Sequence, residues 1–147
     1  IYQVNCTYFS ALEGNEDAYI AARVIQFFSP GIPQVYYVGL LAGENDFELA
    51  RRTKNGRDVN RHNYTLEEAA ERFRKPVVRR LLSLMEFRSA YPAFNGEFTI
   101  EDGPDDHVRL RWTLGNLFAA ADVDLRGYVS RIRYYDERSR EIRTMTA

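Results

Sequence analysis

The sequence contains little cysteine and few histidines, which excludes internal disulfides and clustered His/Cys metal sites. Cys6 is the only cysteine among 147 residues, so the chain cannot form an internal disulfide, which fits a reducing compartment. His62 and His107 lie far apart in the sequence and neither is near Cys6, so no His/Cys cluster has the spacing of a metal site. Phosphate-cradling glycine-rich loops and nucleophile elbows are also missing. We therefore expect no metal and no cofactor.

The sequence also lacks long hydrophobic runs and an excess of one charge. No apolar run approaches the roughly 18–20 residues that a membrane helix needs. The 20 Lys and Arg residues nearly balance the 21 Asp and Glu residues, which leaves a formal net charge of -1. Arginines are interleaved with acids, as in residues 133–138, and this pattern is typical of a solvated surface rather than a phosphate-binding stripe. We expect neither nucleic acid nor a membrane as a partner.

Helical patterns follow an extended, aromatic-rich opening segment that is expected over Tyr2–Leu12. Asn15 has the character of an N-cap, and Ser29-Pro30-Gly31 is expected to end the helix that it starts. The run Thr65-Leu66-Glu67-Glu68 has the form of a capping box and predicts a second helix. Pro76 fits the first turn of a third helix. The expected buried stripe of this third helix comprises Val77, Val78, Leu81, Leu82 and Met85.

The segment Ile32–Val38 decides the expected fold class. It is short, rich in β-formers and placed between helical patterns, which predicts a buried parallel strand. Such a strand needs neighbours on both sides, yet the sequence contains no second convincing one, so we interpret the chain as a fragment. The polar stretch Gly39–Asn63, with one short helix expected around Asp46–Arg52, exceeds the about 12–15 residues of ordinary loops. A long loop after a barrel strand lies on the face where barrel enzymes place their chemistry.

From Asn95 onward, the spacing of the hydrophobic residues changes from that of a helix to an alternation of period two. Val108, Leu110 and Trp112 alternate with arginines, which predicts a strand with one buried face. Further strands are expected at Leu117–Val123, Tyr128–Tyr135 and Glu141–Met145, separated by turn residues. The predicted fold class is therefore α/β, with helices and a parallel strand in residues 1–94, followed by a small antiparallel β domain in residues 95–147.

The loop segment Asn55–His62 is the most suggestive place for ligand binding. A guanidinium such as that of Arg57 presents a rigid fork of donors that suits vicinal sugar hydroxyls or a carboxylate. The alternative is a loop held together by its own Asp, Asn and Arg hydrogen bonds. An enzyme that uses one carboxyl as nucleophile and a second as acid at a sugar bond needs the two about 5–5.5 Å apart. Nothing in the sequence places the loop acids as such a pair, so no catalytic residue is assigned.

Three blocks of the sequence resemble the sucrose phosphorylase group of the α-amylase superfamily. They are Ile1–Tyr8 (IYQVNCTY), residues 30–46 (PGIPQVYYVGLLAGEND) and Gly56–His62 (GRDVNRH). Their order and approximate spacing are those of the family. The resemblance covers roughly residues 1–95 and implies that residues 1–94 are the C-terminal part of a (β/α)8 barrel. Ile32–Val38 would then be its eighth strand and Pro76–Arg88 part of the closing helix.

The resemblance also implies a reaction and a site. In the family a carboxylate takes the glucosyl group from sucrose, and phosphate then receives it to give glucose 1-phosphate and fructose. The catalytic carboxylates would precede Ile1, in the remainder of the barrel, so this chain would lack them. Arg57 would close the glucose pocket, and Tyr2 and Gln3 would end the mobile loop that receives fructose and phosphate in turn. The expected partners are sucrose or a related α-glucoside and phosphate, in the cytoplasm.

Several alternatives stay open at this point. The donor could be sucrose, sucrose 6'-phosphate, or a glucosylglycerol or glucosylglycerate compound, because the residues that would read an acceptor phosphate lie on earlier loops. An α-glucosidase-type hydrolase is another candidate, since water competes with phosphate for one glucosyl-enzyme intermediate. A non-catalytic carbohydrate-binding module derived from such a barrel is the candidate from a different class. The oligomeric state cannot be read from this sequence.

Overall fold

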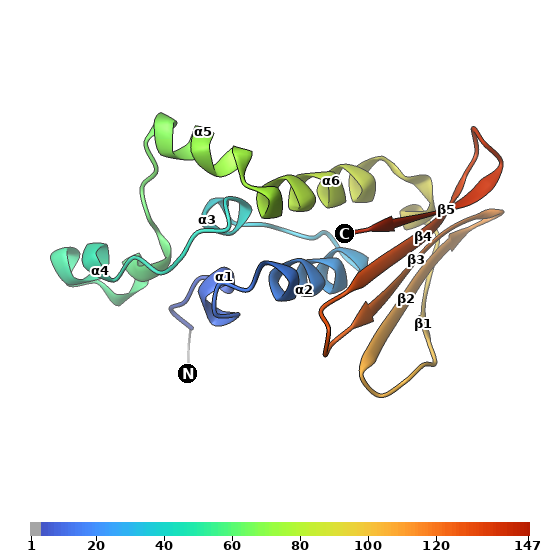
Figure 1. The fold of residues 1–147 in the computed structure, drawn as a ribbon, viewed down its shortest axis with the longest axis horizontal. Coiled ribbons are helices and arrows are strands. Elements are labelled where there is room, and N and C mark those ends of the chain that lie inside the picture. Colours follow the sequence, from blue (N-terminus) through green and yellow to red (C-terminus); the bar gives the residue numbers. More distant parts are fainter. Residues whose placement is uncertain (1–3) are drawn as a thin grey trace. The chain divides into compact units, whose positions relative to one another are not determined.

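A computed structural model describes residues 4–147, which form two compact units. The first unit includes the residues up to Tyr19 together with Gln34–Arg79, and the second comprises Ile20–Pro33 and Arg80–Ala147. The helices are α1 (Tyr8–Ala11), α2 (Glu16–Phe28), α3 (Tyr37–Leu40), α4 (Phe47–Thr53), the 3-10 helix η1 (Gly56–Asn60), α5 (Leu66–Arg74), α6 (Pro76–Ala90) and the 3-10 helix η2 (Pro92–Asn95). The strands are β1 (Glu97–Glu101), β2 (His107–Leu114), β3 (Leu117–Asp124), β4 (Ser130–Asp136) and β5 (Glu141–Thr146) (Figure 1).

The helix starts follow the capping residues in the sequence. The side chain of Asn15 accepts a hydrogen bond from the backbone of Ala18 at 2.9 Å, which caps α2. Thr65 and Glu68 form both bonds of the predicted capping box at the start of α5, at 3.2 and 2.7 Å. Pro76 is the first residue of α6. These three predictions are confirmed.

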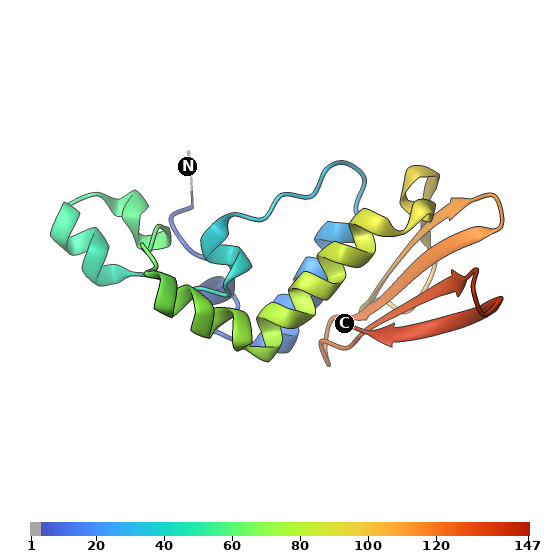
Figure 2. The ribbon, with the colours of Figure 1, turned by 90° about the horizontal axis from the view of Figure 1, so that it is seen from above.

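The structure does not show the strand predicted at Ile32–Val38: Tyr37 and Val38 belong to α3, and the described residues include no partner strand for the rest of the segment. Residues 32–36 belong to no helix or strand, and Tyr37 already starts α3. Figure 2 shows the segment as an unpaired run between α2 and α3. The side chain of Ile32 is 90% exposed, and that of Tyr36 is 56% exposed. A strand requires hydrogen-bonding neighbours, and the described part of the chain offers this segment none in a sheet.

The opening segment is also less extended than predicted. Thr7 accepts a hydrogen bond from the backbone of Ser10 at 3.1 Å and starts α1, and Phe9 is buried. The ring of Phe9 packs edge-on against Tyr19, with the ring centroids 5.3 Å apart. This long-range contact favours one helical turn in a segment without helical periodicity.

The sheet of the second unit is an antiparallel meander with the order β1-β2-β3-β4-β5. Its strands lie where the period-two pattern predicted them, and β1 is added at the edge. Alternate residues point to opposite faces, so one face is buried and the other faces outward. The buried face presents Leu110, Trp112, Ala119, Ala121, Val123 and Ile132.

Aromatic side chains and carbonyl hydrogen bonds join this sheet to helical residues of the same unit. The indole Nε1 of Trp112 donates to the carbonyl of Phe28 at 2.7 Å. Tyr91 donates to the carbonyls of Tyr135 and Phe118 at 2.7 and 3.2 Å, and its ring stacks on Phe87.

A domain boundary near residue 94 stays a prediction.

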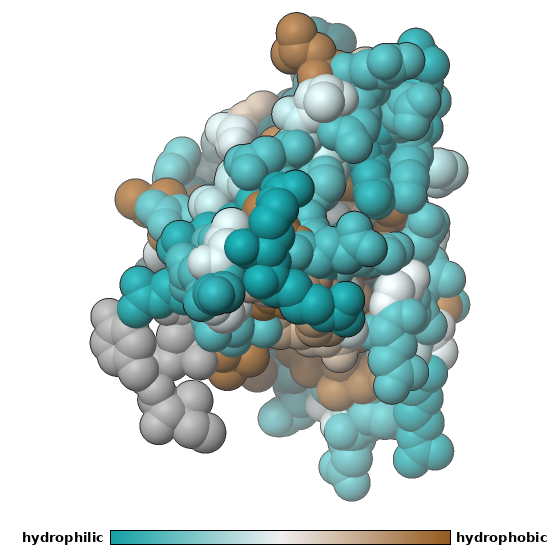
Figure 3. Space-filling view, turned by 90° about the vertical axis from the view of Figure 1, so that its left-hand side faces the viewer, coloured by the Kyte–Doolittle hydropathy of each residue, from teal (hydrophilic) through white to brown (hydrophobic). Residues whose placement is uncertain are grey.

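The face in Figure 3 is mainly hydrophilic, with single hydrophobic residues scattered over it. Scattered apolar side chains of this kind are ordinary on a protein surface. Among residues 4–147, no helix combines the length and hydropathy that crossing a lipid bilayer requires.

We expect the Trp112→Phe variant to be less stable than the wild type. It leaves the buried carbonyl of Phe28 without its donor, which lowers the free energy of unfolding by about 1–3 kcal/mol. Urea unfolding followed by far-ultraviolet circular dichroism measures this, because the variant lacks the only tryptophan. The exposed residue Ile100 supplies the control: Ile100→Thr should change stability by no more than about 0.5 kcal/mol. Equal effects of the two substitutions would contradict the prediction.

Candidate functional site

Arg57 lies on the short 3-10 helix η1, whose start is fixed by Asn55. The side-chain oxygen of Asn55 accepts a hydrogen bond from the backbone of Arg57 at 3.1 Å, and its amide donates to Asp58 at 3.2 Å. Val59 is the buried residue of η1, whereas Arg57 is exposed. The local hydrogen bonds expected of this loop are therefore present, and they hold the backbone that carries the Arg57 guanidinium.

Asp46 closes the base of the loop that contains η1. Its backbone N–H donates to the carbonyl of Val59 at 2.6 Å. One carboxylate oxygen accepts from the backbone of Leu49 at 2.7 Å and thereby caps α4, in the region where the sequence predicts a short helix. The other carboxylate oxygen lies 2.6 Å from Nδ1 of His62. A single residue thus connects the start of α4, the end of η1 and the segment that follows it.

His62 lies between two carboxylates and two tyrosines. Its Nδ1–H donates to Asp46, and its Nε2 is 3.9 Å from the carboxylate of Glu68. The His62 ring meets Tyr64 edge-on at 4.6 Å, and the hydroxyl of Tyr37 donates to the His62 carbonyl at 2.9 Å. These contacts make His62 a hydrogen-bonded histidine of the loop.

The electrostatics follow from these contacts. The hydrogen bonds from His62 and from the Leu49 backbone hold the pKa of Asp46 below its ordinary value. The Thr65 backbone and side chain likewise lower the pKa of Glu68. Burial raises the pKa of the Tyr64 hydroxyl. Both carboxylates beside His62 are therefore ionised at neutral pH.

A polar hollow of about 450 Å³ opens beside this cluster. Its lining combines acids with two arginines, Arg51 and Arg72, and the latter donates to the carbonyl of Ala42 at 3.3 Å. In the part of the chain that the structure describes, no three His, Cys, Asp or Glu side chains are grouped to hold a metal ion. The hollow is lined by Glu44, Asn45, Asp46, Phe47, Glu48, Arg51, His62, Tyr64 and Arg72.

The N-terminal segment is tied to the same loop. The backbone of Thr7 donates to the side chain of Asn45 at 2.7 Å, and the Asn60 amide donates to the carbonyl of Cys6 at 3.5 Å. A Cβ added to Gly56 would lie 3.5 Å from the side chain of Asn5. The described N-terminal segment therefore runs past η1. Tyr2 and Gln3, two predicted site residues, lie outside the described residues.

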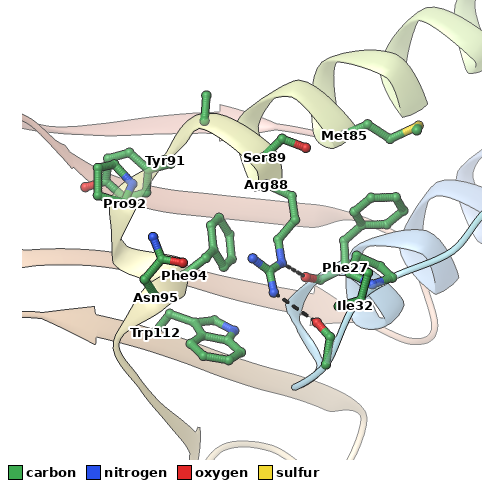
Figure 4. A pocket seen from close by; sticks show the side chains of 13 residues that line it. Phe27, Ile32, Met85, Arg88, Ser89, Tyr91, Pro92, Phe94, Asn95 and Trp112 are labelled. Atoms are coloured by element: carbon green, nitrogen blue, oxygen red, sulfur yellow. Dashed lines mark hydrogen bonds between the residues drawn. The ribbon is translucent and has the colours of Figure 1, made fainter.

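A second hollow, of about 570 Å³, lies in the second unit around Arg88 (Figure 4). The guanidinium donates to the carbonyls of Phe27 and Gly31 at 2.8 and 3.3 Å. Its central carbon lies 4.4 Å from the ring centre of Phe94 and 5.4 Å from that of Trp112. Burial lowers the pKa of Arg88 from its ordinary value. All these contacts bind the arginine to its own fold, so we interpret this hollow as structural.

Sequence reasoning missed Asp46 and Asn45 as organisers of the candidate site. Asp46 was expected only at the start of a helix, and its partner His62 is 16 residues away. Asn45 bonds to Thr7, 38 residues away. The short helix expected around Asp46–Arg52 was the one available signal, and it does not indicate the bonds of Asp46 to Val59 and His62.

We expect the Asp46→Asn variant to be less sensitive to acid than the wild type. Because the folded-state pKa of Asp46 is depressed, its stabilising contribution is present at neutral pH and is lost as the pH falls below about 4. Asparagine still caps α4 but cannot titrate. Thermal unfolding midpoints between pH 6 and about pH 2.5 measure the effect. An acid-induced fall of the midpoint as large in the variant as in the wild type would contradict it.

Comparison with known proteins places these observations in a family. No family model matches the chain. It is 54% identical to a sucrose 6(F)-phosphate phosphorylase of Thermoanaerobacterium thermosaccharolyticum and 53% identical to a glucosylglycerol phosphorylase of Marinobacter adhaerens, in both cases over 97% of this chain. It is also 53% identical, over 76% of its length, to a sucrose phosphorylase of Bifidobacterium adolescentis. The chain covers 29%, 30% and 22% of these proteins, respectively.

The fold agrees with the sequence comparison. The crystal structure of a sucrose 6F-phosphate phosphorylase from Thermoanaerobacter thermosaccharolyticum matches 99% of this chain with a TM-score of 0.96 at 54% identity, and the match covers 29% of that structure. The helices and the five-stranded antiparallel sheet correspond to the C-terminal part of that enzyme. By sequence and by fold, the chain belongs to the sucrose phosphorylase family and corresponds to the C-terminal portion of its members.

Proposed function

We propose that this chain is the C-terminal part of a retaining glycoside phosphorylase that transfers a glucosyl group from sucrose or sucrose 6'-phosphate to phosphate. The observation that carries the proposal is the 54% identity to a sucrose 6(F)-phosphate phosphorylase over 143 residues. The reaction has two displacements. An enzyme carboxylate attacks the anomeric carbon while an acid protonates the leaving oxygen, and a phosphate oxygen then displaces the carboxylate to give glucose 1-phosphate.

The catalytic carboxylates belong, in this proposal, to a (β/α)8 barrel that precedes the chain. Residues 32–36 are its eighth strand, and two features support this. The segment is extended without a sheet of its own, and Ile32 and Tyr36 leave large apolar surfaces in water. Neighbouring strands of a barrel would cover those surfaces and pair with the backbone.

Arg57 is the proposed substrate-binding residue, and Tyr2 and Gln3, which lie outside the described residues, are proposed with it on the family resemblance. The support comes from the loop that carries it: η1 is fixed by Asn55, its base is closed by Asp46, and the exposed guanidinium remains at the surface. A guanidinium can pair with a carboxylate and touch a glucosyl hydroxyl with the same planar fork. A cytoplasmic location is part of the proposal, supported by the single cysteine.

Glucosylglycerol phosphorolysis is the second candidate, because a specific observation favours it. The relative with that name is 53% identical, one percentage point below the sucrose 6(F)-phosphate enzyme. The described residues therefore do not rank the donors. The residues that distinguish the leaving group are expected in the preceding barrel.

The direct test is phosphate-dependent release of glucose 1-phosphate by the full-length polypeptide. Sucrose, sucrose 6'-phosphate, glucosylglycerol and glucosylglycerate serve as donors, each with and without phosphate. We expect one of the first two to be cleaved fastest, with glucose 1-phosphate as the product. Release of free glucose at a rate independent of phosphate would instead indicate a hydrolase, and cleavage of none of the donors would contradict the proposal.

Substitution of Arg57 tests the site. Hydrogen bonds to charged groups contribute about 1.5–3 kcal/mol, so Arg57→Ala should lower kcat/KM by about 10- to 150-fold. Arg57→Lys should recover only part of this loss, since an ammonium lacks the planar fork. Arg52, which is exposed on the nearby helix α4, supplies the control, and Arg52→Ala should retain wild-type kinetics. Wild-type kinetics in Arg57→Ala would remove Arg57 from the site.

A further inference from the structure

Four arginines meet on the outward face of the sheet in the second unit. Arg109 and Arg111 come from β2, and Arg131 and Arg133 come from β4. Strand β3 runs between them, and its register aligns Ala120 with Arg111 on one side and with Arg133 on the other. Directly opposed residues of neighbouring strands have Cβ atoms about 4.5–5.5 Å apart. The small alanine side chain therefore lies between two guanidinium-bearing chains.

A hollow of about 270 Å³ lies at this place on the sheet. The methyl group of Ala120 contributes little volume, so the long side chains on either side form walls around a shallow floor. Pockets for drug-sized ligands begin at about 300 Å³, so this hollow suits a small occupant. Its lining comprises Glu101, Arg109, Arg111, Ala120, Ala121, Asp122, Arg131 and Arg133.

Two of the arginines are held in place by carboxylates. Nε of Arg111 donates to Glu101 at 2.5 Å, and its guanidinium carbon lies 4.7 Å from the ring centre of Phe118. Nε of Arg109 donates to Asp122 at 3.1 Å. Both bonds use the inner nitrogen of the guanidinium, and one terminal nitrogen of Arg109 also donates to the carbonyl of Asp102 at 3.2 Å. Each guanidinium carries five N–H donors, so N–H groups of both arginines remain for a further acceptor.

The other two arginines lack such a counter-ion. Asp122 is the cross-strand neighbour of Arg131, but its two oxygens are engaged by His107 at 2.5 Å and by Arg109 at 3.1 Å. Within residues 4–147, neither Arg131 nor Arg133 has a carboxylate within ion-pair distance. The cross-strand neighbours of Arg133 are the uncharged residues Ala120 and Thr144.

The charge of the hollow is therefore unbalanced. Four guanidinium groups face two carboxylates, which leaves an excess of two positive charges in a chain whose formal net charge is -1. Like charges this close repel one another, and an anion between them would relieve the repulsion. A tetrahedral dianion matches the excess, and its oxygens accept the paired N–H donors of guanidinium groups.

We propose that this hollow binds a phosphate group, either inorganic phosphate or the phosphate of a small sugar phosphate. Arg131 and Arg133 bind the anion, and Arg109 and Arg111 complete the donor set from the opposite wall. The inference does not depend on the proposed function, because it rests on the sheet alone and can be measured without a glucosyl donor.

Isothermal titration of the full-length polypeptide with inorganic phosphate at low ionic strength tests the proposal. The double variant Arg131→Gln, Arg133→Gln should lose a binding component that the wild type has, with affinity reduced by about 100-fold or more. The matched control is Arg138→Gln, an exposed arginine of the β4–β5 turn outside the hollow, which should bind as the wild type does. Identical isotherms for the wild type and the double variant would overturn the proposal.

A second variant keeps all four arginines. Ala120→Glu places a carboxylate on the floor between Arg111 and Arg133, and it should abolish the same binding component while circular dichroism stays unchanged. Retained phosphate affinity in Ala120→Glu would contradict the assignment. Titration with glucose 1-phosphate in place of inorganic phosphate identifies the source: tighter binding that also disappears in the double variant indicates a sugar phosphate, and weaker binding indicates inorganic phosphate.

Discussion

The backbone N–H and C=O groups of residues 32–36 need hydrogen-bond partners, and the proposed place of this chain in a larger barrel depends on that need. Each peptide unit carries a donor and an acceptor that must be satisfied by water or by protein. The segment is extended, belongs to no sheet of the described residues, and exposes 90% of Ile32. A run so rich in β-formers is poorly suited to remain in water. The partner strands that we propose for it would come from the preceding barrel, which explains why the matched relatives are more than three times as long as the match.

The loop that presents Arg57 depends on a separate and local device. Asp46 makes a backbone bond to Val59, a capping bond to Leu49 and a side-chain bond to His62. A loop closed at its base in this way loses less conformational entropy when it binds a ligand than a free loop does. In the second unit, the guanidinium of Arg88 donates to carbonyls of its own fold.

Local sequence signals predicted the elements that depend on local contacts. The caps at Asn15 and Thr65, the start of α6 at Pro76 and the hairpin strands all involve residues near one another in the chain. Features that depend on distant partners were not predictable in this way. The helix α1 needs the contact of Phe9 with Tyr19, and Asp46 needs His62.

The cluster of arginines on the sheet also depends on residues that are distant in the sequence. Along the chain, Arg133 stands among tyrosines and acids and has the appearance of a solvated surface residue. Only the register across β2, β3 and β4 brings it opposite Ala120 and Arg111. Family resemblance adds what local signals lack, because it indicates Arg57 as a site residue without any knowledge of its contacts.

We propose that residues 32–36 form a strand paired with neighbours from the rest of the polypeptide. Hydrogen–deuterium exchange of the full-length protein tests it most directly, since the amides of Ile32, Val35 and Tyr36 report on pairing. If the segment is paired, these amides exchange as slowly as those of the central sheet strand β3. Exchange as fast as that of the exposed turn residues Gly115 and Asn116 would contradict it.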